Sequence, residues 1–145
     1  MPLNNFSVGR DCTIDVFDPQ SGGVIALAIV TSFDAKQDQT RLKSKGLDGL
    51  LRHGVEPDGW SGKITLERRG QQVDALFQIL ENAYYLGQNV QAQTITQTIQ
   101  ENDGSITQWR YSGVALSYDD AGMWSNGKFI SQTIGWFATK RDQVL

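Results

Sequence analysis

The chain has 145 residues and a mass of 16.1 kDa, which is enough for one compact domain with a sizeable core. Its 39% hydrophobic and 20% charged residues exclude a chain that is disordered by composition, and its net charge of −3 argues against gripping duplex DNA or an anionic membrane through bulk charge. One cysteine and one histidine exclude a disulfide scaffold and a Cys/His zinc cluster.

Fourteen glutamines and ten threonines stand beside 15 glycines and only three prolines. Threonine suits pleated, half-buried surfaces and glycine suits turns, so the composition favours an all-β protein with polar surfaces. Residues 1–5 have no basic or apolar segment of a signal peptide, and the apolar run at 24–30 is too short to cross a bilayer. We therefore expect neither a signal peptide nor a membrane span.

Two strands are predicted at the start of the chain. Apolar and polar residues alternate over 12–18, and residues 19–23 carry a turn signal. Residues 24–33 are apolar on both faces, so this strand must be covered on both sides. The two runs predict a β-hairpin.

Residues 34–58 form a long, polar segment with interspersed glycines. Long loops are uncommon in compact domains and are usually functional or disordered. One interpretation is a long protruding loop that packs on another molecule through its leucines. The other interpretation is a flexible surface loop with a short helical turn near residues 47–52.

The middle of the chain predicts one strand and one helix. Residues 60–69 alternate with Trp60, Ile64 and Leu66 on one face. Residues 71–86 then repeat apolar side chains at helical spacing, which predicts a helix that covers one open side of a sheet. The members of that predicted core stripe are Val73, Leu76, Phe77, Leu80 and Tyr84.

Three further strands are predicted over residues 90–100, 106–118 and 128–138. Asp103-Gly104 favours a tight hairpin turn between the first two. In the last strand Ile134, Trp136 and Ala138 share one face. We predict a mainly β, antiparallel sandwich or partly closed barrel with one flanking α-helix, spanning 1–145 as a single domain.

Few residues offer chemistry. Asp119 and Asp120 are adjacent, so on a strand they would point to opposite faces, and His53 has no orienting carboxylate nearby in sequence. Cys12 is most simply a small buried side chain. No nucleophile-elbow, phosphate-loop or zinc-protease motif is present. We predict no catalytic residues, no cofactor and no metal site.

Two groups of cations remain, namely Arg41, Lys43 and Lys45 on the polar segment and Arg68 with Arg69 after the third strand. In an acidic protein they favour complementary charge between identical subunits over a grip on nucleic acid. Thr94, Thr96 and Thr98 form a strand face that is too polar for a dry core. That face should meet water, a water-filled space or a polar partner.

The order and texture of these elements resemble those of bacteriophage tail tube proteins, most closely the contractile-tail type. The resemblance covers nearly the whole chain. It is carried by N-N-F-S-V-G-R-D at the start, the apolar hairpin, the basic excursion, W-S-G-K-I-T-L-E-R-R, the helix D-A-L-F-Q-I-L-E-N-A-Y-Y and the closing threonine-rich strands. Related secretion-system tube proteins share the fold.

The resemblance implies a non-enzymatic, self-assembling virion protein. Such proteins form stacked hexameric rings around a lumen that carries DNA, and their long hairpin loop reaches the neighbouring ring. The implied partners are other copies of the chain, the tail sheath, baseplate and terminator, and a tape-measure protein with DNA inside the lumen. The implied location is the virion tail, assembled in the host cytoplasm without membrane insertion.

On this basis we predict inter-ring contacts at Arg41, Lys43, Lys45, Arg52 and Glu56, and lumen-lining positions at Thr94, Thr96 and Thr98. Two other functions stay open. A sandwich module could bind carbohydrate or peptide through Trp124 and Trp136. A small hydrolase would need a charged pair drawn from Asp119, Asp120, Glu56 and His53.

Overall fold

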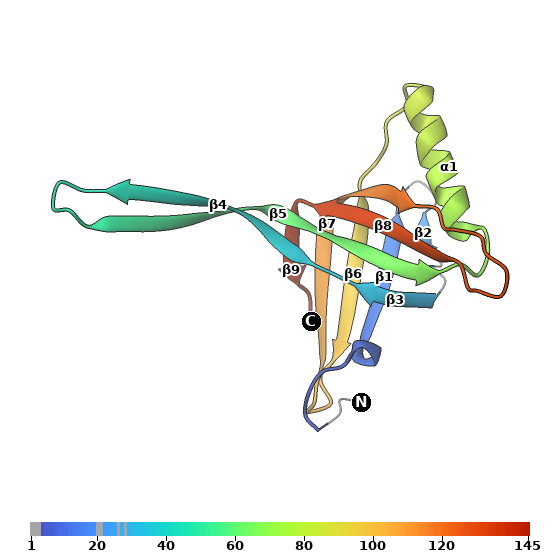
Figure 1. The fold of residues 1–145 in the computed structure, drawn as a ribbon, viewed down its shortest axis with the longest axis horizontal. Helices are drawn as coiled ribbons and strands as arrows, with labels where there is room; N and C mark the ends of the chain where they lie inside the picture. The colour runs from blue at the N-terminus through green and yellow to red at the C-terminus, as the bar shows by residue number, and fades with distance from the viewer. Residues whose placement is uncertain (1–3, 20–21, 26, 28) are drawn as a thin grey trace.

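The computed structural model describes residues 4–19, 22–25, 27 and 29–145, and these form a mainly antiparallel β-structure with a single α-helix (Figure 1). A short 3-10 turn, η1 (Gly9–Asp11), precedes the first strand, and the helix α1 spans Gln72–Tyr85. The strands are β1 (Cys12–Asp18), β2 (Gly23–Ile25), β3 (Ile29–Phe33), β4 (Lys36–Lys45), β5 (Leu51–Glu67), β6 (Gln93–Gln100), β7 (Ile106–Asp120), β8 (Ser131–Ala138) and β9 (Lys140–Gln143).

The nine strands among the described residues make one continuous sheet that folds over into two layers, whose strands cross in Figure 1. The first layer runs β2-β1-β6-β7-β9, and the second runs β7-β8-β5, with β3 and β4 following one another along the far edge of β5. β7 belongs to both layers and bends at Gly113, whose φ is +64°. Glycine tolerates this backbone conformation without steric cost, so a single residue permits the fold-over.

The core lies between the two layers. Trp136 is fully buried, and its ring stacks on Phe33 at 5.5 Å between centroids and meets Tyr111 edge-on at 4.8 Å. The other central residues are Val16, Ile64, Leu66, Val73, Ile95, Val114, Ile134 and Ala138. The predicted sandwich is therefore confirmed, and so is the shared buried face of Ile134, Trp136 and Ala138.

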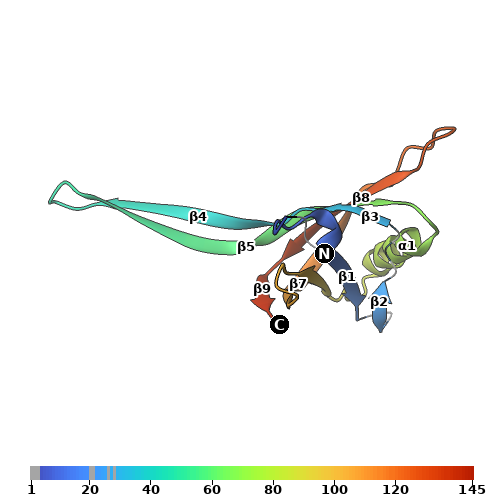
Figure 2. The same ribbon diagram turned by 90° about the horizontal axis from the view of Figure 1, so that it is seen from below.

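The helix agrees with its predicted bounds but not with its predicted packing. It stands at one end of the two layers and points away from them (Figures 1 and 2). Val73 and Leu76 near its start are buried, whereas Tyr84 near its end is 73% exposed. The expectation that Tyr84 belongs to the core is wrong, because near the end of the helix it is the neighbouring Ala83 that is buried. Among the described residues no helix is long and apolar enough to span a membrane.

The segment 34–58 is not a loop. β4 pairs with the first half of β5 from Lys45↔Leu51 to Lys36↔Ser61, so the segment is a long two-stranded hairpin. A tight turn at residues 46–50 ends it, with the Gly46 amide donating to the Leu50 carbonyl at 3.1 Å. The expected helical turn near 47–52 is therefore wrong. Both faces of the hairpin are exposed, so its strands lack the one-sided apolar alternation that marks a strand in sequence.

The remaining differences lie at strand ends. The predicted hairpin of β1 and β2 is confirmed by the pairs Val16↔Ile25 and Asp18↔Gly23. The apolar run 24–33 is divided, since β2 belongs to the first layer and β3 to the second. Residues 26 and 28 of that run, and residues 20 and 21 of the turn before it, lie outside the described residues. So do residues 1–3, which belong to the segment used for the signal-peptide prediction. β9 was not predicted, because residues 140–143 are all polar.

Candidate assembly surfaces

The hairpin of β4 and the first half of β5, here called the arm (residues 36–58), extends clear of the body in Figures 1 and 2. Every residue of β4 is exposed. Leu42, Leu51 and Val55 are 47%, 50% and 57% exposed, so their apolar surface is not covered by the chain's own body. Exposed apolar residues grouped on one projecting element mark an interaction surface.

The five predicted inter-ring residues all lie on the arm. Arg41, Lys43 and Lys45 alternate along β4 and share one face. Arg52 sits near the tip, where its guanidinium contacts the Asp48 carboxylate at 3.0 Å. Glu56 lies nearer the body, opposite Thr40. Their role in contacts between copies stays a prediction.

The three predicted lumen residues lie on the outward face of the first layer. The register places Thr96 between Asp15 and Arg110 in one row across the sheet. The next row contains Thr13, Thr98 and Gln108, and the Gln108 amide donates to Thr98 Oγ1 at 3.2 Å. The Thr96 row continues to Asp142 on β9, so it carries two carboxylates and one guanidinium, whereas the Thr94 row also exposes the apolar Phe17 and Val24. Lumen lining itself stays a prediction.

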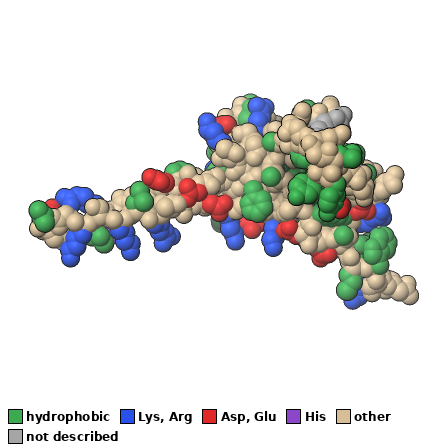
Figure 3. Space-filling view, turned by 90° about the horizontal axis from the view of Figure 1, so that it is seen from above, with side chains coloured by type: hydrophobic (Ala, Val, Ile, Leu, Met, Phe, Trp, Pro, Cys, Tyr) green, Lys and Arg blue, Asp and Glu red, His purple; other side chains and the backbone are tan. Residues whose placement is uncertain are grey.

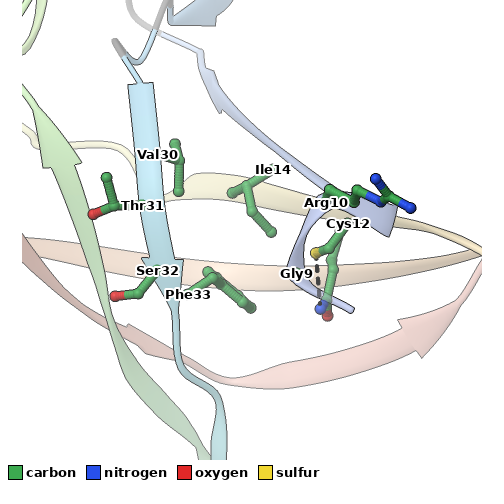
Figure 4. A pocket seen from close by; sticks show the side chains of 9 residues that line it. Gly9, Arg10, Cys12, Ile14, Val30, Thr31, Ser32 and Phe33 are labelled. Atoms are coloured by element: carbon green, nitrogen blue, oxygen red, sulfur yellow. Dashed lines mark hydrogen bonds between the residues drawn. The ribbon is translucent and has the colours of Figure 1, made fainter. Parts of the chain in front are cut away.

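The two layers do not close into a barrel. Among the described strands, the sheet path ends at β2 on one side and at β3 on the other. Between η1, β1 and β3 a cleft of about 530 Å³ opens, lined by Ile14, Val30 and Phe33 (Figure 4). Cys12 lies in this cleft and accepts a hydrogen bond from Gln97 Nε2 at 3.4 Å. Strand edges of this kind invite pairing with another chain.

A third apolar surface gathers at the end of the body opposite the arm, where Figure 3 shows clustered hydrophobic side chains. The loop between β7 and β8 exposes Met123, Trp124 and Phe129 by 77%, 69% and 84%. The guanidinium carbon of Arg68 lies 5.2 Å from the Trp124 ring centroid. At the other end of α1, away from this loop in Figure 1, Tyr84, Tyr85 and Leu86 are also exposed.

A polar network fixes the start of α1 to the second layer. The Asp74 carboxylate accepts hydrogen bonds from the Tyr118 hydroxyl, from Gln132 Nε2 at 3.1 Å and from Arg68 Nε at 3.1 Å. The Tyr118 bond, followed by the Arg68 and Gln132 bonds, lowers the pKa of Asp74. Burial and the neighbouring carboxylate raise the pKa of Tyr118 to about 12. The network therefore stabilises an ionised Asp74 beside a protonated Tyr118.

This network predicts how stability depends on pH. The folded-state pKa of Asp74 is lowered, so its ionised form stabilises the fold at any pH above the unfolded-state pKa of about 3.9. This stabilisation is lost as the pH falls through the folded-state pKa. Asp74→Asn should lower the free energy of unfolding at pH 7 by about 1 kcal/mol, a figure discounted for partial exposure. The variant should also lose less stability than the native chain when the pH falls below about 4. Urea unfolding at pH 3 and pH 7 measures both effects. Glu81→Gln, at an exposed site on the same helix, is the control, and an equal change in that variant would contradict the prediction.

The residues proposed for ligand binding or hydrolysis do not converge. Trp136 is buried in the core, so a ligand surface that uses it together with Trp124 is wrong. Asp120 caps the Gly122 amide at 2.9 Å. His53 and Glu56 lie on opposite faces of the arm, away from the end of β7. Among the described residues no group of three or more acidic, His or Cys side chains could hold a metal ion.

Comparison with known proteins gives one kind of match. No family description matches the sequence, and neither does any curated protein. Solved structures do match. A chain of the sheath–tube complex of an extracellular contractile injection system (PVC, extended state) has a TM-score of 0.68 at 11% identity, covering 98% of this chain and 93% of that one.

Two further structures have the same fold. A chain of the anti-feeding prophage tube-terminating cap has a TM-score of 0.67 at 12% identity, covering 99% of this chain and 94% of that chain. The SPP1 tail tube has a TM-score of 0.58 at 15% identity, covering 94% of this chain and 78% of that one. The protein therefore has the fold found in tube and cap structures of contractile injection systems and phage tails. The resemblance to tail tube proteins is confirmed for the fold.

Proposed function

We propose that the chain is a structural subunit of a phage tail tube, which forms hexameric rings that stack around a lumen through which DNA passes. The observation that carries this proposal is the arm, whose exposed Leu42, Leu51 and Val55 require cover from another molecule. The open edges at β2 and β3 support it, because a neighbouring copy would pair with them. Contacts that repeat head to tail and close produce rings.

The outward face of the first layer is the proposed lumen wall. Thr94, Thr96 and Thr98 offer hydroxyl groups to water there, and Asp15 and Asp142 lie in the same row as Arg110. A wall with little net positive charge neutralises few phosphates, so DNA would slide along it without sticking. Such a role needs no catalytic group, and we infer that the protein is not an enzyme.

The proposed partners follow from the same role. Copies of the chain form the tube, the sheath surrounds it, and baseplate and terminator proteins bind its ends. Tape-measure protein and DNA occupy the lumen, and neither is read by sequence. The protein would be assembled in the host cytoplasm and would reside in the virion tail. A secretion-system-type tube is the alternative setting for the same assembly.

Imaging of the native chain tests the proposal. Purified protein, alone or with an initiating baseplate, should form rings or tubes with a central hole in negative-stain micrographs, and sedimentation should show multiples of the ring. Rings that never stack would identify an end component instead, a possibility favoured by the likeness to a terminating cap. A protein that stays monomeric at every concentration and with a baseplate present would refute the proposal.

A further inference from the structure

The two faces of the arm differ in charge. In an antiparallel ladder, residues directly opposite one another share a face, and neighbours along a strand alternate between faces. Arg41, Lys43 and Lys45 therefore share a face with their partners Val55, His53 and Leu51. This basic face carries three cations and no carboxylate.

The opposite face is acidic where the arm joins the body. Glu56 is the partner of Thr40, and the Thr40 hydroxyl donates to the Asp58 carboxylate, so both carboxylates lie on the Thr40 side. We call Glu56 and Asp58 the acidic face. Figure 3 shows blue side chains along one side of the arm and red side chains on the other side, towards the body.

These five charged side chains form no ion pair within the described part of the chain. Of the described side chains, none lies within ion-pair distance of Arg41, Lys43, Lys45, Glu56 or Asp58. Two cations lie on the acidic side, and both have carboxylate neighbours: Arg52 pairs with Asp48, and Lys36 lies 4.0 Å from Asp34. Each face therefore presents its full charge to a partner.

We propose that the basic face of one arm binds the acidic face of the arm of a second copy. When two arms stack in the same orientation, the basic face of one arm meets the acidic face of the other. A two-fold axis between the arms would instead bring two basic faces or two acidic faces together. The contact is therefore heterologous and repeats from copy to copy. This inference rests on the proposed self-assembly and identifies the surface that receives the arm.

The positions of the charges along the arm also imply an offset between two bound arms. The acidic face is centred near the level of Gln39, and the basic face is centred on Lys43, about four residues nearer the tip. At a strand rise of about 3.3 Å per residue, successive arms are displaced by roughly 13 Å along their length. Lys43 of one copy then lies close to Asp58 of the next.

A protein partner explains the basic face better than nucleic acid does. Leu51 and Val55 lie among its cations and are about half exposed. Apolar side chains between charges suit a protein surface, and they contribute nothing to phosphate neutralisation. The acidic face on the other side of the same narrow ribbon would repel a phosphate backbone.

Charge reversal tests the contact. The basic-reversed variant carries R41E, K43E and K45E, and the acidic-reversed variant carries E56K and D58K. Each alone should raise the protein concentration needed for assembly about tenfold or more, because both faces of every arm then have the same sign. An equimolar mixture should assemble like the native chain, since alternating copies restore every contact. A chain with all five reversals should also assemble alone.

Controls separate this inference from misfolding and from the proposed function. All five side chains are exposed, so circular dichroism and thermal unfolding of the variants should match the native chain. R69E with K128E reverses two exposed cations on the body and should leave assembly unchanged. As a second measurement, copies with K43C should form a disulfide with copies carrying D58C on oxidation.

Three outcomes would overturn the proposal. The first is unchanged assembly of the acidic-reversed variant, and the second is a mixture of folded variants that fails to assemble. The third is a basic-reversed variant that assembles normally but loses binding to a double-stranded DNA oligomer, which would make the basic face a nucleic-acid surface. In all three cases the native chain still assembles, so the tube proposal survives. Failure of the native chain to assemble refutes the tube proposal itself.

Discussion

A chain in which residues 41–55 are replaced by Asn-Gly is expected to fold normally and to lose assembly into tubes. Asn-Gly closes a two-residue hairpin between Thr40 and Glu56, which are directly paired, and the Glu56 amide can donate the hydrogen bond that closes the turn. The removed residues contribute no side chain to the core, so the free energy of unfolding should change by less than about 1 kcal/mol. Negative-stain imaging and sedimentation measure assembly, and urea unfolding measures stability.

A shorter variant separates the shaft of the arm from its tip. Replacing residues 46–50 by Asn-Gly connects Lys45 to Leu51 through a two-residue turn and keeps every residue pair between β4 and β5. We expect this variant to assemble, because the charged faces remain. Full-length tubes from the chain that lacks residues 41–55 would show that the arm has no part in assembly.

Gly62→Ala is expected to destabilise the fold by several kcal/mol, on the order of 3–5. Gly62 lies where the link between β3 and β4 runs against β5, and the Asp34 amide donates to the Lys63 carbonyl at 2.9 Å. A methyl group at Gly62 would collide with the Asp34 carbonyl and lie 2.9 Å from Cζ2 of buried Trp136. Backbone and core would both have to move, so most of the protein should be unfolded at 37 °C.

Gly54→Ala is the matched control on the same strand. A methyl group there would meet only the Leu42 side chain, at an ordinary 3.7 Å, so its free energy of unfolding should stay within about 0.5 kcal/mol of the native value. Thermal unfolding of the two variants side by side measures the contrast. Equal melting temperatures for Gly62→Ala and the native chain would mean that the link between β3 and β4 is not packed tightly against Gly62.

Most of the body could be predicted because one-sided burial leaves a period-two pattern in the sequence. Ile64 and Leu66 alternate with polar residues, and the structure buries both. The arm could not be predicted as strands, because neither of its faces is buried. The division of residues 24–33 between two layers was also hidden, since a run that is apolar on both faces does not show where it turns.

The candidate surfaces were predicted unevenly for a related reason. Arg41, Lys43 and Lys45 are spaced by two, so their shared face follows from sequence once the segment is known to be extended. The acidic face was only half found. Glu56 was named but Asp58 was not, because its side depends on the irregular pairing between Gln37 and Gln39. Pro57-Asp58-Gly59 carries a turn signal that could have indicated such an irregularity. Trp136 was misjudged as a ligand contact although its own strand pattern placed it inside.

The way the arm is rooted has a mechanical consequence. Its returning strand runs without interruption into the body as the second half of β5, held by β8 on one edge and by β3 on the other. A pull directed along the arm would shear these two ladders and load their hydrogen bonds simultaneously, instead of peeling them apart one by one. Tension from a neighbouring molecule would thus spread through the interior before any single bond gave way.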